Sequence, residues 1–414
     1  MILHLLKLVW HRKRANALVM AEIFVSFLIV FAVVTLSTVM VTRWSAPLGY
    51  DWRDVWMLEI DETIPDGPES DATQRTAESI ARTVRELETY PEIVAAAADA
   101  MTPYSNNQWQ NNLSVNGKSI SVSSDIASDR YADVMRLPVV KGRWFSREDD
   151  GSKDLPLVID AHAARAAFGD ENPVGQRFPA GDYAKDKNAV FRIVGVIAPY
   201  RTDGDLSDTQ GNMIFLRAGL QTAAERKAQE RIATDGPGAN RIVFRVRPGT
   251  PRTFEAELDR RLRKTSGASF VLQRMEEMRD SSLRERFSPL IVLTMVAFFL
   301  IAMVTLGLTG VLWQTVTRRM REIGLRRALG ASGPGVRRQI LGELALLVTL
   351  SVAAGALVIL QLPIIGAFRV VTPSEFSAGF GAALVVIYGI AMLCGAYPSW
   401  LASTIEPAEA LRYE

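Results

Sequence analysis

One short segment has residues that could hold a nucleotide phosphate. Gly117, Lys118 and Ser119 match the end of the phosphate-binding pattern Gly-x-x-x-x-Gly-Lys-Ser, in which backbone N–H groups and the lysine hold the phosphates. The pattern requires another glycine five residues earlier, and Asn112 stands there. The residues around Asn116-Gly117 also alternate in polarity, as the two arms of a β-hairpin do. The sequence therefore predicts a turn, and any ATP and Mg²⁺ would be bound by a partner chain.

The other familiar catalytic and metal-binding patterns are absent from the sequence. His4, His11 and His162 are too scattered for a metal set, and Cys394 has no second cysteine to pair with. Neither a His-Glu-x-x-His motif nor a Gly-x-Ser-x-Gly nucleophile turn occurs. We therefore expect no catalytic, cofactor-binding or metal-binding residues and predict that the chain is not an enzyme.

A basic segment between two apolar runs has the clearest helical pattern. Treated as a helix over 316–330, it has two apolar faces separated by arginines, formed by Val316, Met320 and Ile323, and by Leu325, Ala328 and Leu329. Glu322 and Arg326 are four residues apart and can pair with each other or meet a partner. Gly330 would end the helix. Two apolar faces suggest two contacts, whereas the simpler alternative is a basic loop without a partner.

Two glutamates stand inside otherwise apolar runs. Glu22 and Glu343 lie near the ends of their runs, where a carboxylate costs less than at the centre of a bilayer because its side chain can reach the polar interface. Two interpretations stay open: interfacial placement with hydrogen bonds between helices, or a contact that acts in dimerisation or gating.

Four apolar runs are long enough to position these residues in a membrane. A hydrocarbon core about 30 Å thick takes roughly 20 helical residues, because every backbone polar group must be paired within the segment. Averaged over the chain, the hydrophobic fraction of 48% and the charged fraction of 22% do not reveal these runs. The runs lack Lys, Arg and Asp, and they cover 17–41, 290–316, 340–365 and, more weakly, 379–401. The first run is too long for a cleaved signal peptide, so we predict that it is retained.

The positions of the basic residues predict the orientation. Short loops rich in Lys and Arg stay in the cytoplasm. The N-terminus is basic, and the joint between the second and third runs carries seven arginines against one acid, namely Arg318, Arg319, Arg321, Arg326, Arg327, Arg337 and Arg338 against Glu322. Both termini are therefore expected in the cytoplasm and the large middle segment outside it. The net charge of +2 gives no reason to expect nucleic acid.

The expected fold class is an integral membrane α-helical protein with four transmembrane helices and a large mixed α/β extracytoplasmic domain between the first and second. Strand-like and helix-like stretches alternate in the middle segment, and its end, 276–287, predicts a helix continuous with the second span. The predicted segments are a basic N-terminal helix at 1–16, spans at 17–42, 289–316, 340–365 and 379–401, the outer domain at 43–288, a coupling loop at 317–339, a short outer loop at 366–378 and a tail at 402–414.

Six motifs along the chain resemble the membrane subunits of MacB-type and FtsX-like ABC transporters. They follow the family's order and are RYADVMRLPVVKGR at 130–143, PVG at 173–175, VGV at 194–196, REIGLRRALGA at 321–331, YPSW at 397–400 and PAEALR at 407–412. The block at 321–331, placed between two membrane runs, is the most specific. The sequence departs from MacB itself in having no attached ATPase domain, and in Glu22 within the first helix.

The resemblance implies mechanotransmission, in which a separate ABC ATPase moves the outer domain through the membrane helices. It implies a second permease copy or a paralogue, membrane lipids around the helices, and an outer domain with a porter-like base and an inserted subdomain near 125–220. A periplasmic adaptor and an outer-membrane channel are further partners of such systems. The residues expected to contact the ATPase are Met320, Arg321, Glu322, Ile323, Gly324, Leu325, Arg326, Ala328, Leu329 and Gly330.

The leading hypothesis is a permease subunit in the bacterial inner membrane that exports or extracts a lipoprotein, peptide or amphiphile. An FtsX-like regulator of a periplasmic cell-wall hydrolase, which transports nothing, is the alternative. A membrane-anchored sensor is the weakest reading, because the cytoplasmic segments leave no room for a signalling domain.

Overall fold

The computed structural model describes residues 13–61, 69–107, 109–207, 211–219, 239–266, 269–329, 332–366 and 371–404. The chain divides into two compact units: an outer unit, Arg43–Glu285, and a membrane unit, Met1–Thr42 with Arg286–Glu414. Most of the predicted N-terminal helix at 1–16 and of the predicted tail at 402–414 lies outside the described residues.

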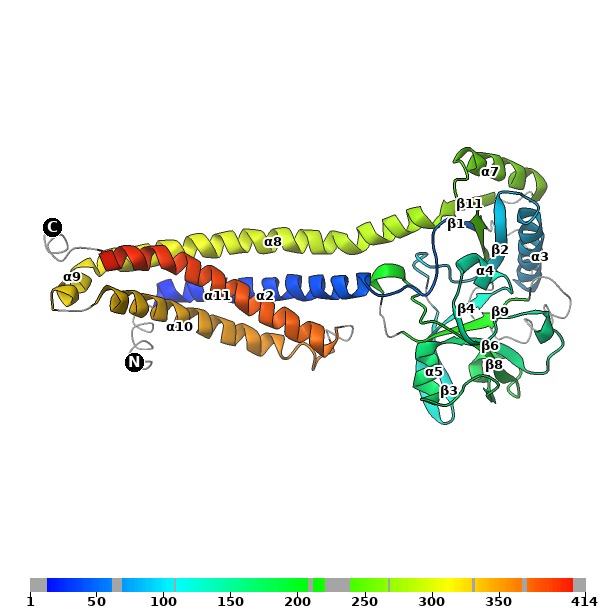
Figure 1. Cartoon of the computed structure of the whole chain (residues 1–414), viewed down its shortest axis with the longest axis horizontal. Coiled ribbons are helices and arrows are strands. Elements are labelled where there is room, and N and C mark those ends of the chain that lie inside the picture. The colour runs from blue at the N-terminus through cyan, green and yellow to red at the C-terminus, as the bar shows by residue number, and fades with distance from the viewer. Residues whose placement is uncertain are drawn as a thin grey trace. The chain divides into compact units, whose positions relative to one another are not determined.

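Long helices dominate the membrane unit. They are α2 Lys13–Trp44, α8 Met275–Arg318, α10 Gly333–Ile359 and α11 Pro373–Thr404, and the short α9 Met320–Ala328 follows α8 (Figure 1). Within the described residues, each long helix contains a stretch that is long and apolar enough to cross a membrane. The expected fold class is confirmed, because four transmembrane helices occur and the large α/β segment lies between the first and second.

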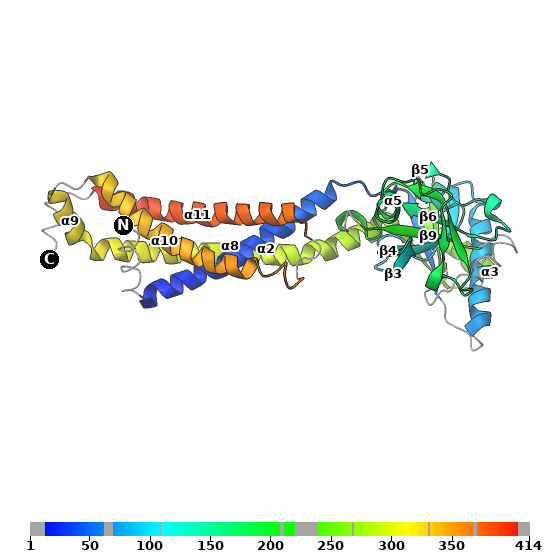
Figure 2. The ribbon, with the colours of Figure 1, turned by 90° about the horizontal axis from the view of Figure 1, so that it is seen from below.

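Aromatic rings and small residues bring the membrane helices together. The ring of Phe31 on α2 packs edge to face against Phe376 on α11, with centroids 5.3 Å apart. Phe27 lies so close to Gly355 of α10 that a Cβ there would come within 2.6 Å of the ring. Helices α10 and α11 also pack against each other, and they run side by side in Figures 1 and 2.

Glycines in membrane helices allow close helix packing, and four of those in the spans are Gly307, Gly310, Gly342 and Gly355. A Cβ on Gly355 would clash with Phe27, and one on Gly307 would lie 2.8 Å from Oε2 of Glu22. By contrast, a Cβ on Gly310 or Gly342 would meet nothing within 4 Å. Close packing therefore explains two of the four positions.

Two helix boundaries differ from the limits of the apolar pattern. Helix α10 ends at Ile359, although the apolar run continues to 365. Pro363 lies four residues beyond Ile359 and has no N–H to donate to its carbonyl, so the helix cannot continue. The helix expected over 316–330 is interrupted at Arg319, which separates α8 from α9.

Among the described residues, eleven strands form one mixed sheet in the outer unit. The strand order is β11-β1-β10-β2-β4-β9-β6-β8-β5, with β3 paired to β4 and β7 to β8. The strands are β1 Val55–Asp61, β2 Ile93–Asp99, β3 Gln110–Val115, β4 Lys118–Ala127, β5 Val139–Gly142, β6 Leu155–Asp160, β7 Arg177–Pro179, β8 Val190–Ile197, β9 Met213–Arg217, β10 Arg241–Val246 and β11 Ser269–Arg274. The predicted hairpin is β3-β4, and Asn116 and Gly117 have the positive φ angles, 50° and 76°, of a tight hairpin turn.

The sheet has two parts joined at a narrow point. Strands β11, β1, β10 and β2 come from the two ends of the outer segment, whereas β4, β9, β6, β8 and β5 come from its middle. Strands β2 and β4 pair only through Asp99 and Ala127 among the described residues. Few backbone hydrogen bonds therefore tie the two parts together at this point.

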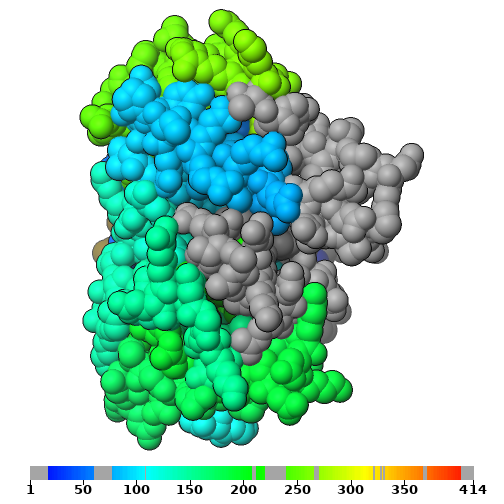
Figure 3. Space-filling view, turned by 90° about the vertical axis from the view of Figure 1, so that its right-hand side faces the viewer, coloured from blue at the N-terminus to red at the C-terminus, as the bar shows by residue number. Residues whose placement is uncertain are grey.

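Helices cover the two faces of the sheet because apolar side chains alternate along the strands. On β10, Ile242 and Phe244 face one core and Val243 faces the other. The first core is covered by α3 Glu69–Leu87, α5 Ala161–Phe168 and α7 Thr253–Ser266; the second by α4 Tyr131–Met135 and the start of α8. Figure 3 shows the surface that α7 and α3 present, above segments of the middle part. Short 3-10 turns lie at Arg147–Asp149, Gly181–Tyr183 and Gly204–Leu206.

Candidate coupling site

Among its described side chains, helix α9 packs on neighbouring helices through one apolar residue. Ile323 is 8% exposed and packs with Val316 of α8 and Val336 of α10, with Ile340 at the edge of this cluster. The predicted inner apolar face, Val316 and Ile323, therefore rests on the protein's own helices. Burial of one isoleucine contributes about 1.5–3 kcal/mol, which is a small anchor for a whole helix.

A chain of polar contacts continues from α9 to α10. Arg326 donates to Glu322 at 2.5 Å and to Oε1 of Gln339 at 3.0 Å, and Gln339 donates to Glu343 at 3.4 Å. Arg319, at the break between α8 and α9, donates to both carboxylate oxygens of Glu343, at 3.0 and 3.1 Å. The sequence placed Glu322 and Arg326 four residues apart, where they can pair with each other or meet a partner, and it did not single out Arg319 or Gln339.

The opposite face of α9 is apolar and open. Leu325 is 53% exposed and Leu329, just after the helix, is 80% exposed, whereas Ile323 is 8% exposed. Leu325 and Leu329 are four residues apart and so are neighbours on one side of the helix, where adjoining exposed apolar side chains offer a contact surface to another molecule. The small cavity of about 30 Å³ under α9 could hold only a water or two.

The structure places the other predicted coupling residues as follows. Gly324 is buried within α9. Met320, Arg321 and Ala328 belong to α9, but their side chains are not among the described ones, and Gly330 lies outside the described residues. Among the residues that the structure describes, no group of His, Cys, Asp and Glu is arranged to hold a metal ion.

The two membrane glutamates have different surroundings. Glu343 pairs with Arg319 and is 17% exposed, so its charge is matched within the membrane unit. Glu22 is partly buried on α2 and faces Gly307 of α8. The side chain of Glu22 therefore lies close to another helix of the same chain.

The other end of α8 is held in the outer unit by a second set of contacts. Arg279 donates to both carboxylate oxygens of Asp205 at 2.8 Å, and its guanidinium lies over the rings of Trp44 and Trp52, at 5.1 and 4.6 Å from their centroids. The hydroxyl of Tyr104 donates to the same carboxylate at 2.9 Å. Burial by itself would raise the pKa of Asp205, but the hydrogen bonds from Arg279 and Tyr104 lower it below its ordinary value.

Arg201 ties the end of α2 into the same region. Its guanidinium donates to the carbonyl oxygens of Arg43 and Ala46 at 2.8 and 3.0 Å, and to those of Asp205 and Ser207 at 2.6 and 2.9 Å. We call Arg279, Asp205, Tyr104 and Arg201 the outer joint. The sequence gave no signal for it, because its members are far apart along the chain and single arginines and acids are common on protein surfaces.

Two carboxyl groups are fully buried where the two parts of the sheet meet. Asp125 accepts hydrogen bonds from the backbone N–H groups of Ala100 and Met101, at 3.2 and 2.9 Å, and Asp99 accepts one from the Thr102 hydroxyl at 2.7 Å. Oδ1 of Asp99 and Oδ2 of Asp125 have no hydrogen-bond partner. Burial raises the pKa of Asp125 to about 6, and burial together with the neighbouring Asp125 raises the pKa of Asp99 well above its ordinary value. Neither is accessible to a substrate, so they are structural groups.

Two family models match the chain. The MacB-like periplasmic core domain matches residues 17–261, and the FtsX-like permease C-terminal region matches residues 294–407. Among curated relatives, the macrolide export ATP-binding/permease protein MacB of Bdellovibrio bacteriovorus is 24% identical over 297 residues, which cover 69% of this chain and 43% of that protein. The pyoverdine export ATP-binding/permease protein PvdT of Pseudomonas fluorescens is 25% identical over 294 residues, covering 69% and 42%.

The chain therefore spans less than half the length of these curated relatives. Among solved structures, the periplasmic region of MacB from Actinobacillus actinomycetemcomitans aligns with 56% of this chain and 94% of its own, at 17% identity and a TM-score of 0.37. The extracellular domain of the ABC-type transporter YknZ from Gram-positive bacteria aligns with 53% and 98%, at 14% identity and a TM-score of 0.33.

Proposed function

Because this chain belongs to the family of the MacB-like periplasmic core domain and continues into an FtsX-like permease C-terminal region, we propose that it is a membrane subunit that transmits ATP-driven motion. A separate cytoplasmic ABC ATPase would bind ATP and Mg²⁺ and would move the helices of this chain. The helices would move the outer domain, which exports or extracts a lipoprotein, peptide or amphiphile. The relatives' names describe export of macrolides and of pyoverdine.

The exposed apolar face of α9 carries this proposal. Ile323 holds the helix to α8 and α10, while Leu325 and Leu329 remain 53% and 80% exposed. A helix that is anchored on one face and open on the other is suited to lie in a groove of a partner, as amphipathic helices do in many complexes. A force on these leucines would reach α8 through Ile323, Val316 and the polar contacts of Arg319.

Helix α8 is the element that would carry the motion. It is a single helix from Met275 to Arg318, and Arg279 near its start belongs to the outer joint. Helices transmit displacement well, because every residue is tied to its neighbours by backbone hydrogen bonds. The motion is a proposal, which the continuity of α8 supports.

The partners follow from the same proposal. We expect an ABC ATPase, a second copy of this chain or a paralogue, and membrane lipids, in a bacterial inner membrane with both termini in the cytoplasm. A periplasmic adaptor and an outer-membrane channel would join if the cargo leaves the cell. The exposed apolar face of α8 in the membrane unit, including Phe298, Phe299 and Leu306, is available to lipid or to the second permease.

The FtsX-like match supports one alternative function. In that case the chain would regulate a periplasmic cell-wall hydrolase and would transport nothing, although α9 would still contact an ATPase. The protein bound outside the membrane distinguishes the two: an adaptor protein indicates export, and a hydrolase indicates regulation.

The test is a pull-down of the tagged chain in mild detergent, with mass spectrometry of the proteins that remain bound. We expect an ATPase with Walker motifs to bind the natural sequence and to be lost with the double variant Leu325→Asp/Leu329→Asp. Val94→Asp is the matched control, because Val94 is 54% exposed but lies in the outer unit. Recovery of no ATPase with the natural chain, or equal recovery with the double variant, would contradict the coupling assignment.

A further inference from the structure

One loop connects the narrow point of the sheet with the outer joint. Loop 100–106 leaves β2 after Asp99, the residue that pairs with Ala127 of β4. Further along, the loop contains Tyr104, whose hydroxyl donates to Asp205 at 2.9 Å. A change at the narrow point can therefore reach the outer joint through one short loop.

The two buried carboxyl groups hold the start of this loop. Oδ1 of Asp125 accepts hydrogen bonds from the backbone N–H groups of Ala100 and Met101, and Oδ2 of Asp99 accepts one from the Thr102 hydroxyl. Each of the first three loop residues is thus bonded to one of the two carboxyl groups. Because both groups are fully buried, a charge on either one acts through the backbone that it holds.

The charged and titratable groups that face the pair do little to neutralise a second charge. Arg241 of β10 is bound to Glu59 at 2.7 Å, and its Nη1 donates to the carbonyl oxygen of Ala100 at 2.9 Å. The hydroxyls of Tyr131 on α4 and Tyr200 after β8 lie near the pair and are bonded to each other at 2.9 Å. One oxygen of each carboxyl group has no hydrogen-bond partner. A buried charge without partners is costly, so the folded unit favours a proton on the pair.

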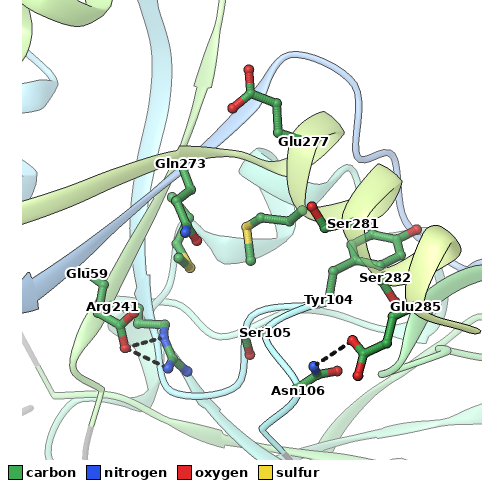
Figure 4. A pocket seen from close by; sticks show the side chains of 12 residues that line it. Glu59, Tyr104, Ser105, Asn106, Arg241, Gln273, Glu277, Ser281, Ser282 and Glu285 are labelled. Atoms are coloured by element: carbon green, nitrogen blue, oxygen red, sulfur yellow. Dashed lines mark hydrogen bonds and ion pairs between the residues drawn. The ribbon is translucent and has the colours of Figure 1, made fainter.

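The far end of the loop is held in an uncommon backbone conformation. Tyr104 has a φ angle of 66°, in the left-handed region that bulky residues rarely adopt. Its ring lies so close to Gly204 that a Cβ there would overlap it, and its hydroxyl is bonded to Asp205. Tyr104 to Asn106 also line a cavity of about 350 Å³ beside the first turns of α8 (Figure 4). Side-chain contacts thus fix this end of the loop, and the cavity gives it room to move once they are lost.

The state of the narrow point should depend on pH. Burial raises the pKa of Asp125 from 3.8 to about 6, although backbone N–H groups favour its charged form, and the pKa of Asp99 is also raised. If the narrow point opens and water enters, both pKa values return toward 3.8. The closed state therefore binds protons more tightly, so low pH favours closing and rising pH favours opening. Between these pKa values the opening constant rises by up to about ten-fold per pH unit for each proton released.

We propose that loop 100–106 is a proton-controlled latch within the outer unit. Protonation of Asp99 and Asp125 keeps the narrow point of the sheet closed and Tyr104 in place at the outer joint. Loss of the protons frees the loop and loosens the hold of the outer joint on α8. The latch needs no ATPase partner, so its test is independent of the proposed function.

The experiment is hydrogen–deuterium exchange of the full chain in lipid nanodiscs, read by mass spectrometry at pH 5, 6 and 7, with each rate divided by the intrinsic rate at that pH. We expect the corrected exchange of loop 100–106 and of the first turns of α8, 275–282, to rise by about ten-fold from pH 5 to pH 7. The loop should exchange faster than the core strands β6 and β8 at every pH, which distinguishes local opening from unfolding of the whole outer unit. Exchange that does not rise with pH, or a loop no faster than the core strands, would overturn the proposal.

One double variant tests whether the two acids control the loop. Asp99→Asn/Asp125→Asn keeps the size of both side chains and an oxygen on each that can accept the same hydrogen bonds. Because amides do not titrate in this range, the corrected exchange of the loop should change by less than about two-fold from pH 5 to pH 7. A rise that persists in this variant would assign the pH dependence to other groups and overturn the proposal.

Tyr104→Phe tests the connection between the loop and α8. The variant keeps the ring and removes the hydroxyl that is bonded to Asp205. We expect the ten-fold rise to remain in the loop and to fall below about two-fold at 275–282. Tyr183→Phe, which removes a buried hydroxyl next to Ser124 in the other core, is the matched control and should leave both rises in place. An unchanged rise at 275–282 in Tyr104→Phe would also overturn the proposal.

Discussion

The two joints of α8 differ in how firmly they are built. At the outer joint, Arg279 is 16% exposed, forms two hydrogen bonds with Asp205 and lies over two tryptophan rings. At the other end of α8, Ile323 and a few polar contacts of the described side chains hold α9, and the pair Arg326–Glu322 is half exposed. A buried, multiply bonded joint keeps its geometry when force is applied, whereas a lightly held helix can adjust to a partner.

This contrast fits the proposed function, in which the chain would receive motion at one end and deliver it at the other. The receiving helix would dock to a partner through its uncovered leucines. The delivering end would need to keep its geometry, and its charges and rings are packed within one unit. Four substitutions or conditions would break or sharpen this comparison.

The largest effect is expected at the outer joint. Arg279→Ala leaves the Asp205 carboxylate buried without its partner, so it should lower the free energy of unfolding of the outer unit by about 3–5 kcal/mol. Denaturant titration followed by tryptophan fluorescence is a direct measurement, because Trp44 and Trp52 contact Arg279. Arg284→Ala, at an exposed position of the same helix, is the control, with an expected change of less than about 0.5 kcal/mol. Equal losses in the two variants would show that the outer joint is not firm.

A change of pH should act on the outer unit alone. The folded-state pKa of Asp125, about 6, and that of Asp99 lie above the value of 3.8 for an exposed aspartate. At pH values between 3.8 and about 6, the folded state therefore binds more protons than the unfolded state. Stability is therefore highest below about pH 4 with respect to these groups and falls as the pH rises through 6, by about 2–3 kcal/mol.

The variant Asp99→Asn/Asp125→Asn should remove this slope, since amides do not titrate in this range. Unfolding of the outer unit, measured at pH 4.5, 6 and 7.5, would reveal the change. A slope that persists in the double variant would assign the pH dependence to other groups.

A smaller effect on stability is expected from breaking the ion pair between Arg319 and Glu343 in the membrane unit. Arg319→Ala removes the partner of Glu343, whose side chain is 17% exposed, and should destabilise the membrane unit by about 2 kcal/mol. Restoring neutrality with Arg319→Ala/Glu343→Gln should recover most of the loss. Thermal unfolding in detergent would measure both, and a double variant no more stable than the single one would argue against the pairing.

The smallest change in stability is expected within α9 itself. Arg326→Ala breaks a half-exposed pair with Glu322, and exposed pairs four residues apart contribute about 0.3–0.5 kcal/mol. Arg326→Glu should likewise leave the protein folded, yet it should reduce stimulation of the partner ATPase by placing two acids on the docking helix. Unchanged stimulation, measured as ATP hydrolysis by the purified complex, would remove Arg326 from the coupling contact.

Much of the outer fold could be predicted from local patterns, and two strands could not. The hairpin about Asn116-Gly117 has turn residues between two alternating arms. Strand β2 is a run of alanines, which favour strands weakly, and it is buried on both faces because α3 and α4 cover it. Strand β9 is fully buried and shows no alternation, so its sequence alone does not distinguish a strand from other apolar segments.

For the coupling site, the sequence predicted two apolar faces, and the structure decided which of them is free. The helical spacing put Ile323 and Leu325 on different faces, but only the approach of Val336, on another helix, shows that Ile323 is the covered one. The outer joint could not be predicted from the sequence, since Arg279 and Asp205 are 74 positions apart. Nothing in a single arginine or aspartate indicates which partner it will find.

The sequence by itself determined the membrane spans, and it predicted the side of the membrane on which the basic N-terminus and the arginine-rich joint lie. Both depend on requirements that each segment meets alone: a helix in lipid must pair its own backbone groups, and a cluster of arginines resists crossing the bilayer. The tertiary structure decided the two joints of α8 and the buried acid pair. These depend on residues that are distant in the chain, and their energy comes from burial and from partners that only folding brings together.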